Sequence, residues 1–144
     1  MRTWKERGLR RLAAIAADLV CANVPRPAAD VITYIPPDGD RSVRRGHQPA
    51  RGLAQALGER WSLPVAPLLE RARPVARQTG LSRPERRRNA RGAFRVRAGA
   101  TVPKRVVLVD DVYTTGATVG AGAAALRRAG AREVNVVTFA RAVR

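Results

Sequence analysis

The sequence contains few of the residues on which several classes of protein depend. Cys21 is the only cysteine among 144 residues, so the chain can form neither an internal disulfide nor a multi-cysteine zinc site. No apolar run approaches the roughly 20 residues of a membrane span, and the N-terminus has no secretory hydrophobic segment with a cleavage site. We therefore expect a cytoplasmic protein without membrane insertion, in which Cys21 is a buried thiol on a helix.

Acidic residues are also scarce, because 11 Asp and Glu stand against 28 Lys and Arg, for a formal net charge of +17. Such an excess attracts polyanions, which include nucleic acids, anionic membrane surfaces and phosphorylated metabolites. Arginine supplies nearly all of this charge and can contact phosphates with two hydrogen bonds at once. The bias toward Ala, Arg, Gly and Val also fits GC-rich coding. Composition therefore does not decide between a surface that binds phosphates and a basic surface that results only from codon bias.

The apolar pattern predicts an α/β protein that forms one domain over residues 1–144. We expect an N-terminal helix over 3–22, within residues 1–24, to pack on a sheet, because apolar residues recur there at helical spacing. Those residues are Trp4, Leu9, Leu12, Ile15, Ala16 and Leu19. Further strands are predicted at 30–35, 106–109 and 134–139, and further helices at 50–60 and 117–129.

The two later helices should each turn an apolar face toward the sheet. The residues expected to point inward are Leu53, Ala54, Leu57, Val119, Ala123 and Leu126. Gly120 and Gly122 should permit close packing of the last helix, at some cost in helix propensity. Strand, helix and strand over residues 106–139 imply a parallel crossover.

The most informative stretch is Val106–Thr118. Its first four residues are apolar and predict a strand buried on both faces of a parallel sheet. Asp110 and Asp111 would then stand at the C-terminal end of that strand, where open α/β sheets bind ligands. The turn that follows consists of Thr114, Thr115, Gly116, Ala117 and Thr118.

This turn lies where a helix begins, so backbone N–H groups, the helix dipole and hydroxyls converge in a way that suits a phosphate. The paired carboxylates would repel a phosphate and suit sugar hydroxyls or a divalent cation instead. A phosphorylated sugar would satisfy both halves of the stretch.

Other families that place acids after a strand fit less well. The chain has no Gly-x-x-x-x-Gly-Lys-[Ser/Thr] loop of nucleotide triphosphatases and no Gly-x-Gly-x-x-Gly fingerprint of dinucleotide folds. A receiver-type domain carries its acids near its start, whereas only 33 residues follow Asp111 here. A plain solvated strand end would leave the threonine- and glycine-bearing turn unexplained.

The stretch Val106–Thr118 resembles the phosphoribosyl-pyrophosphate signature of type I phosphoribosyltransferases. The resemblance implies an α/β fold with a mostly parallel sheet flanked by helices. It implies that Asp110 and Asp111 bind the ribose hydroxyls and that Thr114 through Thr118 bind the 5-phosphate. It also implies Mg²⁺, for which the two aspartates would be ligands directly or indirectly.

A second segment extends the resemblance. The strand over 30–35 runs into Pro36 and Pro37, a basic loop follows, and Arg45-Gly46 leads into a helix, as in the ComF-like branch of the family, which is associated with competence and DNA uptake. We expect a pyrophosphate site there, although the arginines could also be merely solvated. The residues of this site are Pro36, Arg41, Arg44 and Arg45. His47, Gln48 and Pro49 depart from that branch, which leaves His47 a weak catalytic candidate.

Residues 71–97 carry ten arginines and cannot be core, so they are either flexible or draped over an anionic ligand. A similar segment in the ComF-like branch corresponds to the hood that covers the bound phosphosugar and excludes water. The matching hood residues are Gln78, Arg87 and Asn89. A nucleic-acid-binding arm is the rival interpretation, although only Phe94 could stack on bases here.

The resemblance implies a protein that binds phosphoribosyl pyrophosphate or ribose 5-phosphate and transfers the phosphoribosyl group to an unknown acceptor. Two alternatives stay open: a non-catalytic protein of DNA uptake that binds single-stranded DNA, and a phosphosugar sensor without turnover. ComF-like relatives commonly begin with a four-cysteine zinc module, which the single cysteine here cannot build. No residue identifies itself as a general base.

Overall fold

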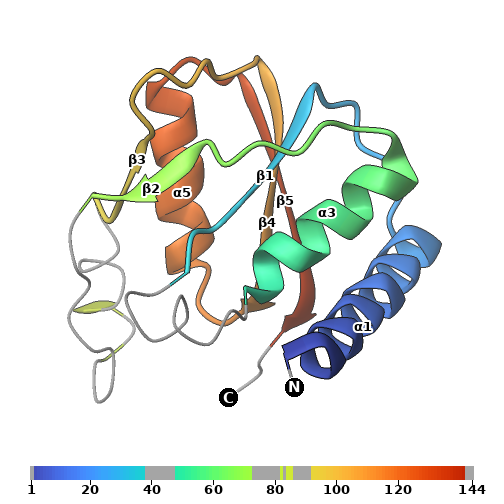
Figure 1. The fold of residues 1–144 in the computed structure, drawn as a ribbon. Coiled ribbons are helices and arrows are strands. Elements are labelled where there is room, and N and C mark those ends of the chain that lie inside the picture. The colour runs from blue at the N-terminus through green and yellow to red at the C-terminus, as the bar shows by residue number, and fades with distance from the viewer. Residues whose placement is uncertain (1, 38–47, 73–81, 83, 86–91, 142–144) are drawn as a thin grey trace.

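The structure is a computed structural model that describes residues 2–37, 48–72, 82, 84–85 and 92–141. The elements are α1 (Arg2–Asn23), β1 (Val31–Tyr34), α3 (Pro49–Trp61), β2 (Leu69–Arg71), β3 (Phe94–Val96), β4 (Arg105–Tyr113), α5 (Ala117–Arg128) and β5 (Glu133–Arg141). The strands form a parallel sheet in the order β1-β4-β5 and an antiparallel β2-β3 pair. Figure 1 shows α1 and α3 on one side of the parallel sheet and α5 on the other. The predicted α/β architecture, a mostly parallel sheet flanked by helices, is confirmed.

The central strand β4 contains the buried apolar run that the sequence predicted. Val106 through Val109 have no solvent exposure, because β1 and β5 flank them and helices cover both faces. The expected end of this strand was wrong, since β4 continues to Tyr113, opposite Arg141 of β5. Asp110 and Asp111 therefore lie inside the strand and not after it.

Two apolar clusters cover the two faces of the sheet. On one face, Leu53, Ala54 and Leu57 of α3 are buried with Ile32 and Val107. On the other face α5 packs over the alternate residues of the same strands, since neighbouring side chains on a strand point in opposite directions. The buried residues on this second face include Val31, Val106, Leu108, Val119, Ala123 and Leu126. All the residues of α3 and α5 that the sequence placed inward are buried.

The two glycines in the middle of α5 differ in their surroundings. A Cβ atom added to Gly122 would lie 2.9 Å from Ile35 Cδ1 and 3.1 Å from Leu108 Cδ2, whereas one added to Gly120 would meet nothing within 4 Å. The expectation of close packing is therefore right for Gly122 and wrong for Gly120, which faces solvent.

The first helix packs differently from the prediction. Its small residues make the contact, with Ala17 and Val20 buried among residues of α3 and the sheet, while Leu12, Ile15 and Leu19 are exposed. Cys21 is half-buried on this helix, not fully buried, and burial raises the pKa of its thiol.

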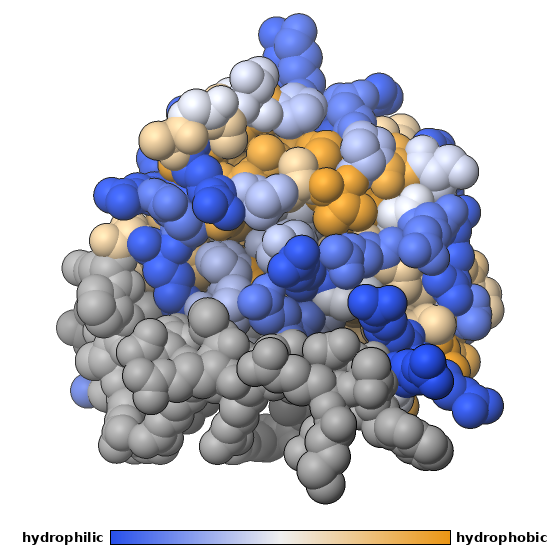
Figure 2. Space-filling model, viewed as in Figure 1, coloured by the Kyte–Doolittle hydropathy of each residue, from blue (hydrophilic) through white to orange (hydrophobic). Residues whose placement is uncertain are grey.

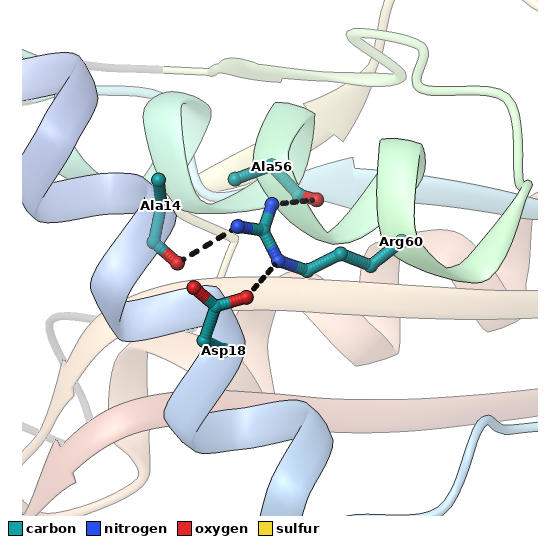
Figure 3. Close-up of polar contacts among 4 residues, drawn as sticks. All are labelled: Ala14, Asp18, Ala56 and Arg60. Carbon is teal, nitrogen blue, oxygen red and sulfur yellow. Dashed lines mark hydrogen bonds and ion pairs between the residues drawn. The ribbon is translucent and has the colours of Figure 1, made fainter.

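Arg60 of α3 holds α1 in place, as Figure 3 shows. Its Nε donates to Asp18 Oδ1 at 2.6 Å, and its other two nitrogens donate to the carbonyl oxygens of Ala56 and Ala14 at 3.0 and 3.1 Å. The hydrogen bond from Arg60 lowers the pKa of the Asp18 carboxyl below its ordinary value. The Arg60 guanidinium thus links α3 to α1 through both a side chain and a backbone carbonyl of α1.

The ends of the arginine-rich segment belong to the folded core, contrary to expectation. Ala93 and Phe94 are buried against the α5 side of the sheet, and β3 pairs with β2. The burial of Phe94 also removes the one aromatic ring of this segment from stacking on a base. Within the described part of the chain, no helix combines the length and hydropathy needed to cross a membrane. Figure 2 shows hydrophilic residues over much of one face, with hydrophobic residues gathered near its centre.

Candidate phosphosugar site

The two aspartates lie at the end of the sheet where β4 outruns β1. The last contact between these strands is the Ile35 N–H that donates to the Val109 carbonyl oxygen at 2.9 Å. Pro36 and Pro37 follow in the chain and have no N–H to continue the ladder. On its other side β4 continues to pair with β5, with Asp110 opposite Thr138. Within the described residues, the segment of β4 that carries the acids is therefore paired on one side only.

The two carboxylates leave the strand on opposite faces. Strand alternation puts Asp110 on the α5 face, with Val106 and Leu108, and Asp111 on the α3 face, with Val107 and Val109. Asp110 Oδ1 accepts the N–H of Asp111 at 2.9 Å. Both residues are half-buried.

On the α3 face, Asp111 lines an open groove together with the start of α3. The other residues of that end of the groove include Gln48, Pro49, Gly52 and Val112. Figure 1 shows the first turns of α3 and α5 at the same, lower edge of the molecule as the end of β4. Two helix N-termini thus lie at the same edge as the acidic pair, which is the edge where open α/β sheets bind ligands.

The turn after β4 has a backbone that only glycine accommodates easily. Gly116 is the N-cap of α5 with φ 76° and ψ 0°, in the left-handed region that costs other residues energy. A Cβ atom there would overlap the Tyr113 hydroxyl and lie 2.8 Å from Tyr113 Cζ. Tyr113 was not singled out by the sequence, and its ring also lies 5.9 Å from the Arg141 guanidinium.

The first turn of α5 has the features of an anion site. It contains no acidic residue, its leading N–H groups have no acceptor within the helix, and the helix dipole adds positive potential. Thr115 Oγ1 accepts the Ala117 N–H at 3.3 Å. Thr114 is exposed, and Thr115, Gly116, Ala117 and Thr118 are partly exposed. The turn is open to a ligand from solvent.

Arg71 fixes the chain where it leaves β1. It donates from Nε to the Pro37 carbonyl oxygen at 2.9 Å and from Nη2 to that of Pro36 at 3.2 Å. Its guanidinium also lies 5.0 Å from the centre of the Phe94 ring. No local pattern in the sequence distinguishes Arg71 from the other arginines of residues 71–97.

Several predicted site residues lie outside the described residues, so their roles stay predictions. They are Arg41, Arg44, Arg45 and His47 of the predicted pyrophosphate loop and Gln78, Arg87 and Asn89 of the predicted hood. Pro36, which belongs to the same pyrophosphate prediction, is half-buried and directly follows the last residue hydrogen-bonded to β4.

The described residues offer few donors for a metal ion. Among the described residues, no three His, Cys, Asp or Glu side chains gather into a group that could hold a metal ion. Asp110 and Asp111 supply one carboxylate on each face of β4. Mg²⁺ is commonly bound by one or two carboxylates together with phosphate oxygens of a substrate, so either carboxylate fits Mg²⁺ that arrives with a ligand.

Comparison with known proteins identifies the family. The family model described as "Phosphoribosyl transferase domain" matches residues 5–143. Competence protein ComFC of Streptococcus pneumoniae is 35% identical over 107 residues, 74% of this chain and 46% of that protein. Competence protein F of Haemophilus influenzae is 33% identical over 142 residues, 96% of this chain and 62% of that protein. DNA utilization protein YhgH of Salmonella typhi is 37% identical over 114 residues, 76% of this chain and 48% of that protein. The chain therefore spans about half the length of these relatives.

Solved structures agree with this assignment. The allosteric regulatory enzyme of purine biosynthesis superposes with a TM-score of 0.59 and 26% identity, over 91% of this chain and 25% of that one. The glutamine phosphoribosylpyrophosphate amidotransferase of B. subtilis superposes with a TM-score of 0.57 and 28% identity, over 91% of this chain and 26% of that one. The chain belongs to the phosphoribosyl transferase domain family, with the type I phosphoribosyltransferase fold, and is related to the ComF competence proteins.

Proposed function

We propose that this chain binds phosphoribosyl pyrophosphate at the end of the sheet where β4 outruns β1. One observation carries the proposal: Asp110 and Asp111 directly follow the buried part of parallel strand β4, and a left-handed glycine at a helix N-terminus comes within a few residues after them. Acids and an anion site at adjacent positions match the hydroxyl and phosphate ends of one phosphorylated sugar.

Each part of the ligand has a group of residues assigned to it in this proposal. The 5-phosphate lies at the first turn of α5, where Thr115 exchanges its hydrogen bond to the Ala117 N–H for the phosphate and frees that amide to donate. The ribose hydroxyls donate to Asp110 and Asp111. The pyrophosphate lies beside Pro36, with Arg41, Arg44 and Arg45 as its cationic partners.

Mg²⁺, bound with the ligand near the two aspartates, would neutralise the charge of the pyrophosphate leaving group. The hood residues Gln78, Arg87 and Asn89 would cover the sugar and keep water from it. Pyrophosphate release on addition of candidate acceptors would extend the function from binding to phosphoribosyl transfer. Binding without such release would identify a phosphosugar sensor.

The test measures the affinity of the folded chain for phosphoribosyl pyrophosphate and for ribose 5-phosphate by calorimetry with Mg²⁺ present. Exchanging both acids, Asp110→Asn with Asp111→Asn, should weaken both affinities by at least about tenfold, because hydrogen bonds to charged groups contribute about 1.5–3 kcal/mol each. Asp30→Asn is the matched control, since Asp30 pairs with Arg105 at the opposite end of β4. Undiminished affinity in the double variant would show that the site has been assigned to the wrong residues.

A second candidate function is binding of single-stranded DNA. The net charge of +17 and the names of relatives in competence and DNA utilization favour it. Affinity for an oligonucleotide should then fall steeply as salt rises, because phosphate contacts release counterions. The double aspartate variant should keep this affinity. A steep salt dependence with no phosphosugar binding would make DNA the principal ligand.

A further inference from the structure

One long strand edge has no partner in the described residues. β5 ends the sheet order β1-β4-β5 and is hydrogen-bonded there to β4 alone. An open edge exposes unpaired N–H and C=O groups, and proteins usually protect it with proline, an interior charge or a bulge. β5 has no proline and no charged residue between Glu133 and Arg141, and its register with β4 is continuous. This edge is therefore ready to pair with another strand.

Large hydrophobic side chains gather beside the same edge. In the described part of the chain the exposed ones are Leu12, Ile15, Leu19, Val24, Val112, Val136 and Phe139. Every one belongs to α1, to the residue after it, to the end of β4 or to β5. Leu12, Ile15 and Phe139 also line one groove. Isolated exposed apolar residues are normal, but neighbouring ones on the elements that border one strand edge mark an interaction surface.

The orientation of α1 explains why this group is exposed. A Cβ atom on Gly52 of α3 would lie 3.5 Å from Ala13 Cβ, and the Ala14 carbonyl oxygen accepts a hydrogen bond from Arg60, so this side of α1 faces α3. Leu12, Ile15 and Leu19 share another side of the helix, since residues three and four apart align. They are 64%, 49% and 51% exposed. Figure 1 shows α1 beside α3 at the margin of the molecule.

The sequence of β5 is complementary to itself in the antiparallel direction. When Val137 stands opposite its own copy, Glu133 lies opposite Arg141 of the second copy, and this pair occurs twice. Val136 then lies opposite Thr138, and Asn135 opposite Phe139. Pairs of opposite charge and of β-branched side chains are the ones that stabilise neighbouring strands.

We propose that β5 pairs with β5 of a second copy of this chain, so that two three-stranded sheets become one continuous sheet around a two-fold axis. An axis perpendicular to the sheet leaves both α1 helices on the same face. Their residues Leu12, Ile15 and Leu19 then cover the junction from that face.

Charge gives this dimer a distinctive dependence on salt. Each copy carries +17, and the repulsion between the copies is screened as ionic strength rises. Dimerisation should therefore strengthen with salt, whereas binding of nucleic acid weakens.

The experiment measures mass by sedimentation equilibrium at low and moderate salt, with folding of each variant checked by circular dichroism. The expected mass at moderate salt is about twice the 15.6 kDa of one chain. Glu133→Arg alone and Arg141→Glu alone should each weaken the dimer by about tenfold, because like charges then oppose each other twice. The two changes together should restore it. Arg97→Glu, a charge reversal on an exposed residue outside β5, should leave the dimer unchanged.

Two further variants probe the surface without touching the charge pair. Leu19→Glu and Val136→Lys alter exposed side chains and should each dissociate the dimer while the chain stays folded. A single-chain mass at both salt concentrations overturns the proposal. A dimer whose stability is unchanged in all four single variants also overturns the proposal, since association would then use another surface. Those variants are Glu133→Arg, Arg141→Glu, Leu19→Glu and Val136→Lys.

Discussion

Gly116 offers the sharpest test of the proposed phosphate-binding turn, residues 114–118. It caps α5 in the left-handed conformation, and a Cβ atom there would overlap the Tyr113 hydroxyl. Gly116→Ala should therefore strain the backbone and displace the Tyr113 ring. Gly120→Ala is a matched control in the same helix, because Gly120 has nothing within 4 Å of the added Cβ.

The two substitutions should change stability in opposite directions. A left-handed conformation costs a non-glycine residue about 1–2 kcal/mol, and displacing a packed side chain adds to this, so Gly116→Ala should lose about 1–3 kcal/mol. Gly120→Ala should gain up to about 1 kcal/mol from helix propensity. For a chain of this size 1 kcal/mol corresponds to roughly 2–5 °C in melting temperature.

The assay combines thermal unfolding with affinity for ribose 5-phosphate, measured well below both melting temperatures. Gly116→Ala should melt several degrees lower, by the conversion just given, and bind the sugar at least about tenfold more weakly, since the amides of the turn no longer converge. Gly120→Ala should keep the affinity of the parent chain. Equal melting temperatures for the two variants would refute the left-handed turn. A lower melting temperature with full affinity would refute its role in phosphate binding.

Three further predictions concern the packing on each side of the sheet. Gly122→Ala should destabilise the chain relative to Gly120→Ala by about 1–3 kcal/mol in chemical denaturation, because its Cβ would press on Ile35 and Leu108; equal values would contradict the close approach of α5. The lowered pKa of Asp18 means that its pairing with Arg60 stabilises the fold above the ordinary value of 3.8 and is lost as pH falls through the lower folded value. Because the variant has no carboxyl to protonate at this position, the melting temperature of Asp18→Asn should fall less steeply than that of the parent chain as pH drops below 3.8. An unchanged pH profile would contradict the pairing. Arg60→Gln, which also removes donors to two carbonyl oxygens, should speed amide exchange in α1 more than Asp18→Asn does.

The central strand and the covering helices could be predicted from the sequence because their signals are local. Four consecutive apolar residues before Asp110 identify a strand buried on both faces, and the apolar spacing of Leu53, Ala54 and Leu57 identifies the inner face of a helix. These signals depend only on neighbours along the chain, and the structure confirms them.

The contact face of α1 could not be predicted in this way. The usual rule puts the largest apolar residues inward, and it selected Leu12, Ile15 and Leu19. The helix instead approaches α3 closely, with Ala13 facing Gly52, so only small side chains fit between the two axes. Which face of an apolar helix is covered depends on the partner helix, and that information is distant in the sequence.

The role of Arg71 could not be read from the sequence either. Its acceptors are carbonyl oxygens of Pro36 and Pro37, about 35 residues away in the chain. Every residue has a backbone carbonyl group, so residue types do not reveal which carbonyl accepts a hydrogen bond. Ten arginines in residues 71–97 look alike until the fold brings one of them to the end of β1.

The wrong prediction of where β4 ends bears directly on the candidate site. Pro36 and Pro37 lack the N–H groups that would extend β1, so its pairing with β4 stops at Val109. β5 contains no proline, and its pairing with β4 extends as far as Tyr113. In the described residues the acids thus have a neighbouring strand on one side only. A ligand that binds at Asp110 and Asp111 needs this arrangement, because a fully paired strand would leave it no room and an unpaired one would not hold the carboxylates in position. The difference in length between β1 and β4 is therefore the feature of the fold that makes a site at this edge possible.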